Sequence, residues 1–160
     1  MPIKIFKVLL IGWCTISIPL HAQDTDEQQI ISVVEEFFTA LSNLDRQALQ
    51  AVTVPGSLNI STSITADGET RLSILDYEGM LTALSRPRAT PIERYWDATV
   101  LVQGSIAVFW APYDFHIGGE FSHCGIDSFQ LVKQEGQWLL SNLSWTRELE
   151  NCPVSPLGPI

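Results

Sequence analysis

The sequence is poor in basic residues. It has 9 Lys and Arg against 18 Asp and Glu, which gives a formal net charge of −9. A chain with this balance repels the phosphates of nucleic acids and the surfaces of anionic membranes. We therefore expect no nucleic-acid partner. Beyond that exclusion, the acidic balance indicates only a soluble surface.

The motifs of the common cofactor, metal and triad enzymes are also missing. Gly118-Gly119 is the tip of a hairpin and has no following helix, so it is not a phosphate-binding loop. His116, His123 and Cys124 do not have a metal-ligand spacing, and neighbouring residues of a strand point to opposite faces. The same geometry separates Ser122 from His123, so no Ser/His/Asp triad is readable. We expect no metal and no cofactor.

The sequence also lacks a hydrophobic run long enough to cross a membrane. A membrane-spanning helix needs about 20 apolar residues. The apolar run Val8 to Ile18 is shorter and is followed by Pro19. It is preceded by Lys4 and Lys7 and followed by Leu20-His21-Ala22, a sequence typical of a cleavage site. This order predicts a secretory signal peptide over residues 1–22.

The predicted leader sets the expected location and the domain limits. Trp13 is too bulky for the position before a lipid-modified Cys14, so we expect no membrane anchor in the mature chain. Cleavage would remove Lys4 and Lys7 and no acid, taking the formal charge from −9 to −11. We expect an exported protein, periplasmic or secreted, with one domain over 23–152 and an irregular Pro-rich tail over 153–160.

Two of the three cysteines, Cys124 and Cys152, remain after the predicted cleavage. Export permits oxidation, and an even number favours one bridge. A bridge closing a loop of about 30 residues stabilises a fold by about 3–4 kcal/mol in the loop-entropy model. Two separate thiols, one buried and one exposed, are the alternative.

Helical periodicity begins just after the leader. Thr25 and Gln28 form a capping-box pattern, and apolar residues then recur at helical spacing from Ile30 to Leu44. Asp45 caps a second, shorter helix that ends before Pro55-Gly56. Residues 58–64 alternate as in a half-buried strand with a turn at Asp67-Gly68, and a third helix is predicted to start at Ser73.

Four long strands are predicted for the second half, at about 94–103, 105–117, 120–134 and 137–147. Gly104, Gly118-Gly119 and Gly136 fall at their junctions, where hairpin turns need residues that tolerate positive φ. Helices followed by a meander of strands predict an α+β fold. Because so few helices cannot cover two faces of a long sheet, we expect a cone: a strongly curved antiparallel sheet closing over N-terminal helices, with an apolar pocket inside.

Three segments and one late cysteine carry a family resemblance. AVFWAPYDF (107–115), FSHCGIDSFQLV (121–132), GQWLLSNLSWTRE (136–148) and Cys152 resemble the nuclear transport factor 2-like superfamily, and within it exported SnoaL-like and lumazine-binding-like proteins. The resemblance implies the curved-sheet cone, often dimeric through the outer sheet face. It implies no single activity, because the superfamily includes isomerases, polyketide cyclases, dehydratases and noncatalytic binders. The Asp and Tyr/Asp pattern of its ketosteroid isomerases has no position-matched counterpart here.

His123 and Asp127 are the candidate catalytic residues. They share one face of the strand around 121–131 with Phe129, four residues apart and roughly 13 Å along the backbone. An apolar pocket would shift either group towards a pKa useful for proton transfer. The alternative is structural: His123 hydrogen-bonds a neighbouring strand or turn, and Asp127 pairs with Arg94 or Arg147.

Aromatic residues are the candidate ligand-binding set. Both faces of 107–117 are apolar, so the pattern does not decide which face lines the pocket. The sequence predicts a binder of a small hydrophobic or aromatic molecule, as a homodimer. Two alternatives stay open: a cofactor-independent isomerase, cyclase or dehydratase, and a noncatalytic protein-interaction module. The candidate ligand-binding residues are Trp96, Trp110, Tyr113, Phe115 and Trp145.

Overall fold

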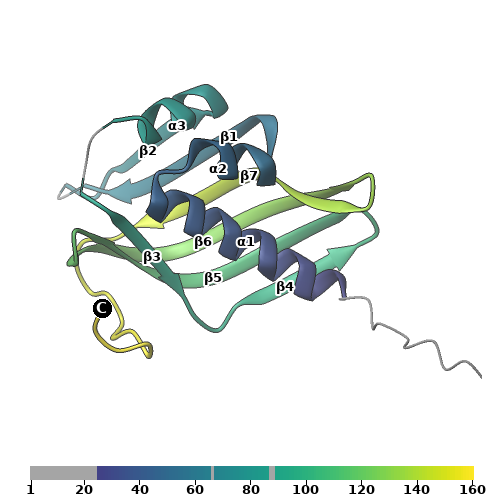
Figure 1. The fold of residues 1–160 in the computed structure, drawn as a ribbon. Helices are drawn as coiled ribbons and strands as arrows, with labels where there is room; N and C mark the ends of the chain where they lie inside the picture. Colours follow the sequence, from purple (N-terminus) through teal and green to yellow (C-terminus); the bar gives the residue numbers. More distant parts are fainter. Residues whose placement is uncertain (1–24, 66, 87–88) are drawn as a thin grey trace, which may run out of the picture.

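The chain forms one curved sheet with helices on its concave face (Figure 1). The computed structural model describes residues 25–65, 67–86 and 89–160, so the predicted leader lies outside the described residues. The strand order is β2-β1-β7-β6-β5-β3, and β4 pairs with β5 beside β3. The elements are α1 (Asp26–Asn43), α2 (Arg46–Val52), β1 (Thr53–Ile64), β2 (Thr70–Asp76), α3 (Tyr77–Leu84), β3 (Pro91–Tyr95), β4 (Thr99–Gln103), β5 (Ile106–Ile117), β6 (Glu120–Gln134) and β7 (Gln137–Arg147).

The capping box that begins α1 is confirmed. Thr25 Oγ1 accepts from the Gln28 backbone N–H at 3.3 Å, and Gln28 Oε1 accepts from the Thr25 N–H at 2.9 Å. Each bond satisfies a donor that a helix N-terminus otherwise leaves unpaired. The helix ends where Leu44 adopts a left-handed φ of 54°. Asp45 then caps α2 as predicted, accepting from the Ala48 N–H at 3.0 Å.

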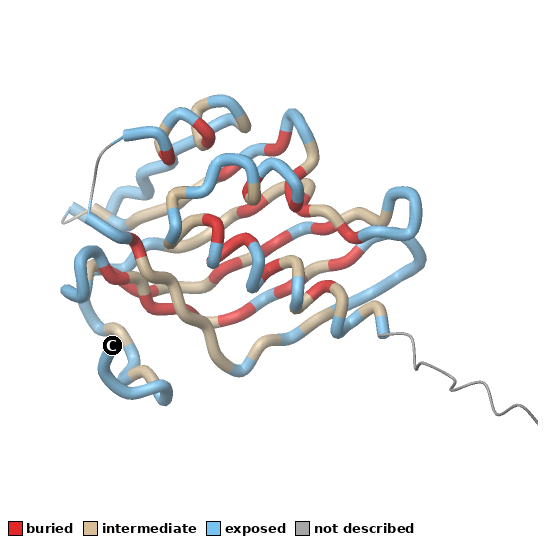
Figure 2. Tube along the Cα trace, viewed as in Figure 1, coloured by how far each residue is buried: buried red, intermediate tan, exposed pale blue. Residues whose placement is uncertain are grey.

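The core lies between α1 and the central strands. Phe129 on β6 meets Phe37 and Phe38 on α1 and Phe109 on β5 at ring-centroid distances of 5.3, 5.5 and 5.7 Å, all edge to face. Such aromatic pairs each contribute about 0.5–1.5 kcal/mol beyond the burial of their area. Figure 2 shows the buried residues along α1 and the strands beneath it. This packing makes the concave face of the sheet the inner face.

The prediction of a helix starting at Ser73 was wrong. Residues 70–76 form β2, paired antiparallel with β1 from Leu58–Asp76 to Ile64–Thr70. The turn that was predicted at Asp67-Gly68 returns the chain alongside β1, and the ladder that follows outweighs local helix preference. The helix starts at Tyr77, because the Asp76 side chain accepts from the Gly79 N–H at 2.8 Å.

The single strand predicted over about 94–103 is two strands, β3 and β4, and both pair with β5. The extended backbone is interrupted between them at Asp97, whose φ is 46°. The strands predicted at 105–117, 120–134 and 137–147 agree with β5, β6 and β7 to within one residue, whereas β1 begins at Thr53, five residues before the predicted start. The sheet is mixed rather than wholly antiparallel, because β1 runs parallel to β7. A long meander separates these two strands in the sequence, so no hairpin dictates their relative direction.

The predicted bridge between Cys124 and Cys152 is present, with Cα atoms 5.8 Å apart. It ties the C-terminal segment to the outer face of β6. Residues 153–160 have no helix or strand, and Arg94 Nη1 donates to the Gly158 carbonyl at 3.0 Å. The tail therefore lies against the outer face of the sheet. No helix in the described part of the chain is long and apolar enough to cross a membrane.

Candidate functional site

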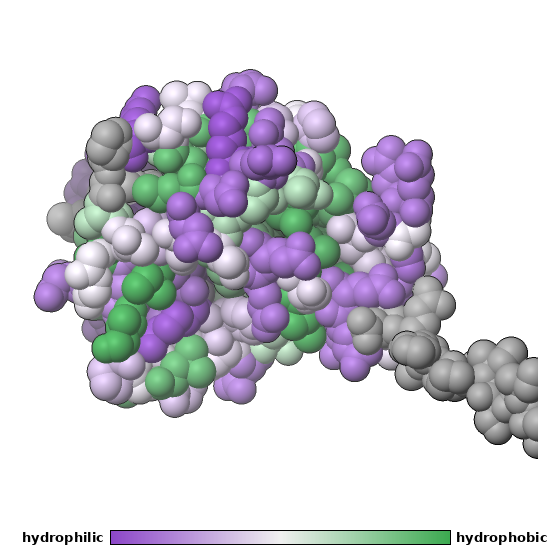
Figure 3. Space-filling view, viewed as in Figure 1, coloured by the Kyte–Doolittle hydropathy of each residue, from purple (hydrophilic) through white to green (hydrophobic). Residues whose placement is uncertain are grey.

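A cavity of about 180 Å³ lies between the helices and the inner face of the sheet. Asn59 on β1 and Glu93 on β3 both line it, although β7, β6 and β5 lie between those strands in the sheet. The sheet curvature brings the two ends together around the cavity. In Figure 3 hydrophobic residues come to the surface in the area between α1 and α3. The other lining residues are Phe37, Leu41, Leu75, Met80, Ala83, Leu84, Phe115, Leu143 and Trp145.

The cavity volume limits what can enter without movement of the walls. Pockets for drug-sized ligands typically have about 300–1,000 Å³, whereas an apolar cavity of about 150 Å³ accommodates benzene. At about 180 Å³ this cavity suits one ring with a short substituent. A fused multi-ring molecule would fit wholly inside only if the walls moved.

Two carboxyl groups meet at the cavity wall. Glu93 lines the cavity and is hydrogen-bonded to Asp127 on β6, which is 1% exposed. Glu93 as a whole residue is half-buried. Burial of its carboxyl group raises the pKa of Glu93 to about 7. Burial first, and then the negative charge of Glu93, raise the pKa of Asp127 well above its usual range. One proton is therefore shared at neutral pH, held by Asp127 and donated to Glu93.

The surroundings of Asp127 explain why it keeps a proton. Its neighbours across the sheet are Ala111 on β5 and Trp145 on β7, which carry no positive charge. Its Oδ2 atom is buried without a hydrogen-bond partner among the described residues. A carboxylate in such a place is destabilised relative to the neutral acid. The arrangement provides an acid and a base side by side.

His123 lies on the same buried face as Asp127, as predicted. Its ring packs on Phe115 at 4.8 Å and on Tyr113 at 5.8 Å between centroids. Its Nδ1 is 3.0 Å from Ser122 Oγ, so the expectation that strand geometry separates these two side chains was wrong. His123 does not line the cavity, but its neighbour Phe115 does. Burial, and secondarily the positive charge of Arg147, lower the pKa of His123 to about 4, so the ring is neutral at pH 7.

The candidate aromatic residues are divided between the two faces. Phe115 and Trp145 line the cavity. Tyr113 is fully buried on the inner face, and its hydroxyl donates to the Thr146 carbonyl at 2.8 Å. Trp110 points to the outer face and is 51% exposed. Trp96 is half-buried and is not among the lining residues.

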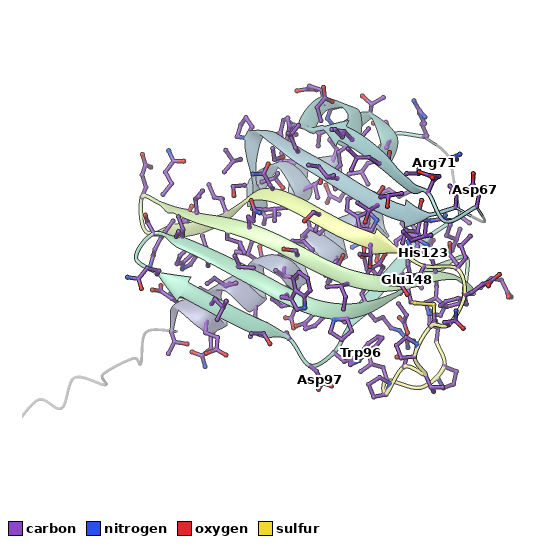
Figure 4. All side chains as sticks on the ribbon, turned by 180° about the vertical axis from the view of Figure 1, so that it is seen from behind. Asp67, Arg71, Trp96, Asp97, His123 and Glu148 are labelled. Carbon is purple, nitrogen blue, oxygen red and sulfur yellow. A yellow bond between two sulfur atoms is a disulfide. The ribbon has the colours of Figure 1, made fainter. Side chains whose placement is uncertain are left out.

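The view from behind separates these residues further (Figure 4). Trp96 and Asp97 lie at the connection from β3 to β4, away from His123. His123 lies at the same end of the sheet as Asp67 and Arg71 of the β1–β2 hairpin. The core decides this division, because Phe109 must face Phe129 and every second residue of β5 then faces inward.

Arg94 does not pair with Asp127. Its Nε and Nη2 donate to Asp114 Oδ1 and Oδ2 at 2.9 and 2.6 Å on the outer face. Arg147 acts on His123 and Tyr113 through its charge, and no ion pair with Asp127 is found among residues 25–65, 67–86 and 89–160. The proposed structural partners of Asp127 are thus replaced by a second acid, Glu93.

Sequence reasoning missed Glu93. In the segment Pro91 to Tyr95 the alternation that places Arg94 outward places Glu93 inward, and Glu93 pairs across the sheet with Phe115. That alternation is visible in the sequence. The register of β3 against β5 is not visible, because the sequence predicts β3 and β4 as one strand. Within the described ranges no group of three His, Cys, Asp or Glu side chains could hold a metal ion.

Comparisons with known proteins come from structure alone. No protein-family model matches the chain, and the search of curated proteins finds no significant match. A nuclear transport factor 2-like protein from Cytophaga hutchinsonii matches with a TM-score of 0.64 at 16% identity, over 78% of this chain and 99% of that one. The chain has the nuclear transport factor 2-like fold.

Two further solved structures support that assignment. A protein of unknown function with a cystatin-like fold from Nostoc punctiforme matches with a TM-score of 0.62 at 14% identity, over 83% of this chain and 96% of that one. A candidate dehydratase of the nuclear transport factor 2-like family from Streptomyces avermitilis has a TM-score of 0.58 at 13% identity, over 78% and 97%. At these identities the nuclear transport factor 2-like likeness shows the fold and leaves the activity open.

Proposed function

We propose that this chain is an exported small-molecule-binding protein whose ligand is a single-ring apolar molecule with one polar group. The observation that carries the proposal is the apolar cavity of about 180 Å³ with the Glu93–Asp127 pair at its wall. An apolar pocket with few convergent polar groups is the usual form of a ligand site. Export is supported by the leader pattern of residues 1–22 and by the Cys124–Cys152 bridge.

The walls fit such a ligand. Phe37, Phe115 and Trp145 provide aromatic surface from α1, β5 and β7, and Met80 on α3 provides a side chain that adapts its shape. Filling the cavity removes this surface from water, which stabilises the complex by about 25 cal/mol for each Å² of apolar area. Glu93 then gives the ligand one defined orientation.

Native mass spectrometry tests the proposal on mature protein purified from its own export compartment without reducing agent. We expect a retained molecule smaller than a two-ring compound. The matched pair of variants is Ala83→Leu, which fills the cavity, and Thr82→Leu, which adds the same side chain at an exposed position of α3. Loss of the adduct in Ala83→Leu alone supports the cavity as the site. Equal occupancy in both variants would place the ligand elsewhere.

An enzyme is the second candidate, favoured by the Glu93 pKa of about 7. A base with this pKa is suited to proton transfer at neutral pH, and the neighbouring protonated Asp127 can exchange a proton with Glu93. This chemistry fits a cofactor-independent isomerase, cyclase or dehydratase, and the candidate dehydratase from Streptomyces avermitilis shares the fold. In this proposal Glu93 takes the role of base, Asp127 is a positioning residue that donates a hydrogen bond to Glu93, and His123 has a supporting position beside Phe115.

Deuterium exchange at the α-carbon of cyclohexanone, followed by NMR in D₂O, measures such proton transfer directly. Enzyme-catalysed exchange should fall at least tenfold in Glu93→Gln and should not change in Thr82→Leu. Exchange no faster with the original protein than in buffer alone would remove the enzyme candidate for ring ketones and leave the binding proposal intact.

We also propose that the protein is a homodimer through the outer sheet face, as the resemblance implies. The outer face of β1 and β2 carries Ile64, Leu72 and Ile74, which are 68, 58 and 58% exposed. An apolar sheet face of this kind is a typical association surface. Sedimentation equilibrium tests it, with Leu72→Lys and Ile74→Lys expected to give monomers.

A further inference from the structure

We propose that the ligand of the cavity is a small amine bound as its ammonium cation, with N–H groups donated to Glu93 and its apolar body against Phe115 and Trp145. This inference rests on the proposed binding function and names the chemistry of its ligand. It follows from the charges at the cavity wall, the aromatic lining, and the unpartnered oxygen of Asp127.

The charges that a ligand meets in the cavity are of one sign. Among the described residues that line it, Glu93 is the one ionisable side chain, and none is Lys, Arg or His. Behind Glu93 stands Asp127, a second acid, with Oδ2 buried and unpartnered. A carboxylate or phosphate ligand would therefore enter a low-dielectric site with no cation to pair with it. Such burial is strongly unfavourable.

A cation in the same place is stabilised by the negative charge that destabilises an anion. An ammonium group offers up to three N–H donors and no acceptor. It can pair with Glu93, which lines the cavity and whose charge is otherwise desolvated. A buried ion is tolerated when it is both paired and hydrogen-bonded. A bound cation therefore neutralises the carboxylate charge at the cavity wall.

The cation and protons compete for the acid pair. Without a ligand the two acids relieve their desolvation by binding protons, which is why the pKa of each is raised. A bound ammonium ion replaces that relief and releases a proton from the pair. Amine affinity should therefore fall as the pH is lowered below about 7, the pKa of Glu93.

The aromatic walls and the net charge act in the same direction. Phe37, Phe115 and Trp145 line the cavity, and a cation over the face of an aromatic ring is attracted by the ring's electrons. The formal charge of −9 on the whole chain attracts cations and repels anions before contact. A neutral alcohol of the same shape could donate one hydrogen bond to Glu93 but would gain none of these charge effects.

Isothermal titration calorimetry of the mature, oxidised protein with three matched probes tests the inference. The probes are benzylamine, benzyl alcohol and benzoate at pH 7.5, where benzylamine is protonated. We expect benzylamine to bind at least tenfold more tightly than benzyl alcohol, and benzoate not to bind. Titration in two buffers with different ionisation enthalpies should show proton release with benzylamine alone.

Glu93→Gln keeps the shape of the cavity wall and removes its charge. We expect this variant to bind benzylamine at least tenfold more weakly and benzyl alcohol within threefold of the original protein. Glu120→Gln removes an exposed carboxyl at the start of β6 and is the control, with no change for either probe. If Glu93→Gln misfolds by near-ultraviolet circular dichroism, the original protein still decides the question: benzylamine affinity must fall between pH 7.5 and 5.5 while benzyl alcohol affinity does not.

The outcomes separate this inference from the binding proposal. Equal affinity for benzylamine and benzyl alcohol, both lost in Ala83→Leu, would overturn the ammonium ligand and keep the apolar binding site. Benzylamine binding unchanged by Glu93→Gln, or by acidification, would also overturn it. Absence of binding for every probe would overturn both proposals.

Discussion

Two buried aspartates on neighbouring strands of the same sheet have opposite electrostatic surroundings. Asp114 on β5 is 4% exposed and faces outward, whereas Asp127 on β6 is 1% exposed and faces inward. Burial alone would raise the pKa of Asp114, but the hydrogen bonds from Arg94, the Ser155 side chain and the positive charge of Arg94 together help to outweigh burial, and that pKa is lowered. Asp127 has a second acid as its partner, so its pKa is raised.

The difference shows that burial alone does not identify a functional acid. A buried carboxylate paired with a guanidinium is a finished structural contact, because each charge is satisfied by the other. A buried acid paired with another acid keeps a proton, and it has an acceptor oxygen without a donor. A ligand can exchange with that proton or donate a hydrogen bond to the pair. The inner pair therefore carries the functional proposal, and the outer pair anchors the tail.

The largest effect that we expect comes from the bridge over the outer face. Replacing Cys124 and Cys152 together by Ser should lower the free energy of unfolding by about 3–4 kcal/mol, because the unfolded chain gains freedom. Urea denaturation with and without reducing agent measures this. Ligand binding in the folded variant should not change, since the cavity lies on the other face. Loss of binding would show that the two faces are coupled.

The two aspartates should respond differently when each loses its partner or its charge. Arg94→Met leaves Asp114 buried without its cation and should destabilise the fold by about 2–4 kcal/mol. Asp127→Asn should change stability by less than about 1 kcal/mol at pH 7, because the amide can donate to Glu93 as the protonated acid does. Both variants are compared by chemical denaturation. Similar losses for the two would contradict the distinction between the pairs.

The inner pair should also make stability depend on pH. Because the folded-state pKa of Glu93, about 7, lies above the usual value of 4.5, the folded state binds more protons than the unfolded state between those values. Stability contributed by the protonated group is complete below 4.5 and is lost as the pH rises through about 7. Glu93→Gln should therefore be more stable than the original at pH 8, by about 1–3 kcal/mol, and equal to it at pH 4.5.

Thermal denaturation of both proteins across pH 4.5 to 8 provides the measurement. The difference between them is informative, because His123 contributes a trend of the opposite sign. Its folded-state pKa of about 4 lies below the usual 6.5, so stability is lost as the pH falls through that interval. A constant difference between the proteins at every pH would mean that Glu93 is not desolvated.

The smallest expected effect concerns the outer-face tryptophan. Trp110→Ser removes an exposed side chain and should leave ligand affinity within twofold, whereas Trp145→Leu removes part of the cavity wall and should lower affinity about tenfold or more. Titration with benzylamine compares the two. A reduced affinity in Trp110→Ser would require that the ligand contacts the outer face.

Much of the fold could be predicted because its signals are local. The capping box at Thr25 and Gln28, the helical spacing of α1, and the hairpin at Gly118-Gly119 each depend on residues close in sequence. The helix expected at Ser73 failed for the complementary reason: β1 supplies the pairing that makes residues 70–76 a strand. Propensity is a weak preference where a sheet edge is available.

The candidate site could be predicted in part. Period-two alternation on β6 places His123 and Asp127 on the buried face together with Phe129, as the structure has them. The sequence leaves open which face of β5 turns inward, because apolar residues occupy both sides. Trp110 and Phe115 therefore look equivalent in the sequence, and only the packing of Phe109 against Phe129 and α1 separates them.

By itself the sequence determined the α+β order of elements, the amphipathic first helix, the hairpins, and the pair of cysteines that form the bridge. Only the tertiary structure decided that Glu93 meets Asp127, that Arg94 turns to Asp114, and that a ring-sized cavity remains between them and α3. The physical reason is that contacts between distant strands depend on the register of β3 against β5 and on the curvature of the whole sheet. Neither quantity is present in any short segment of the chain.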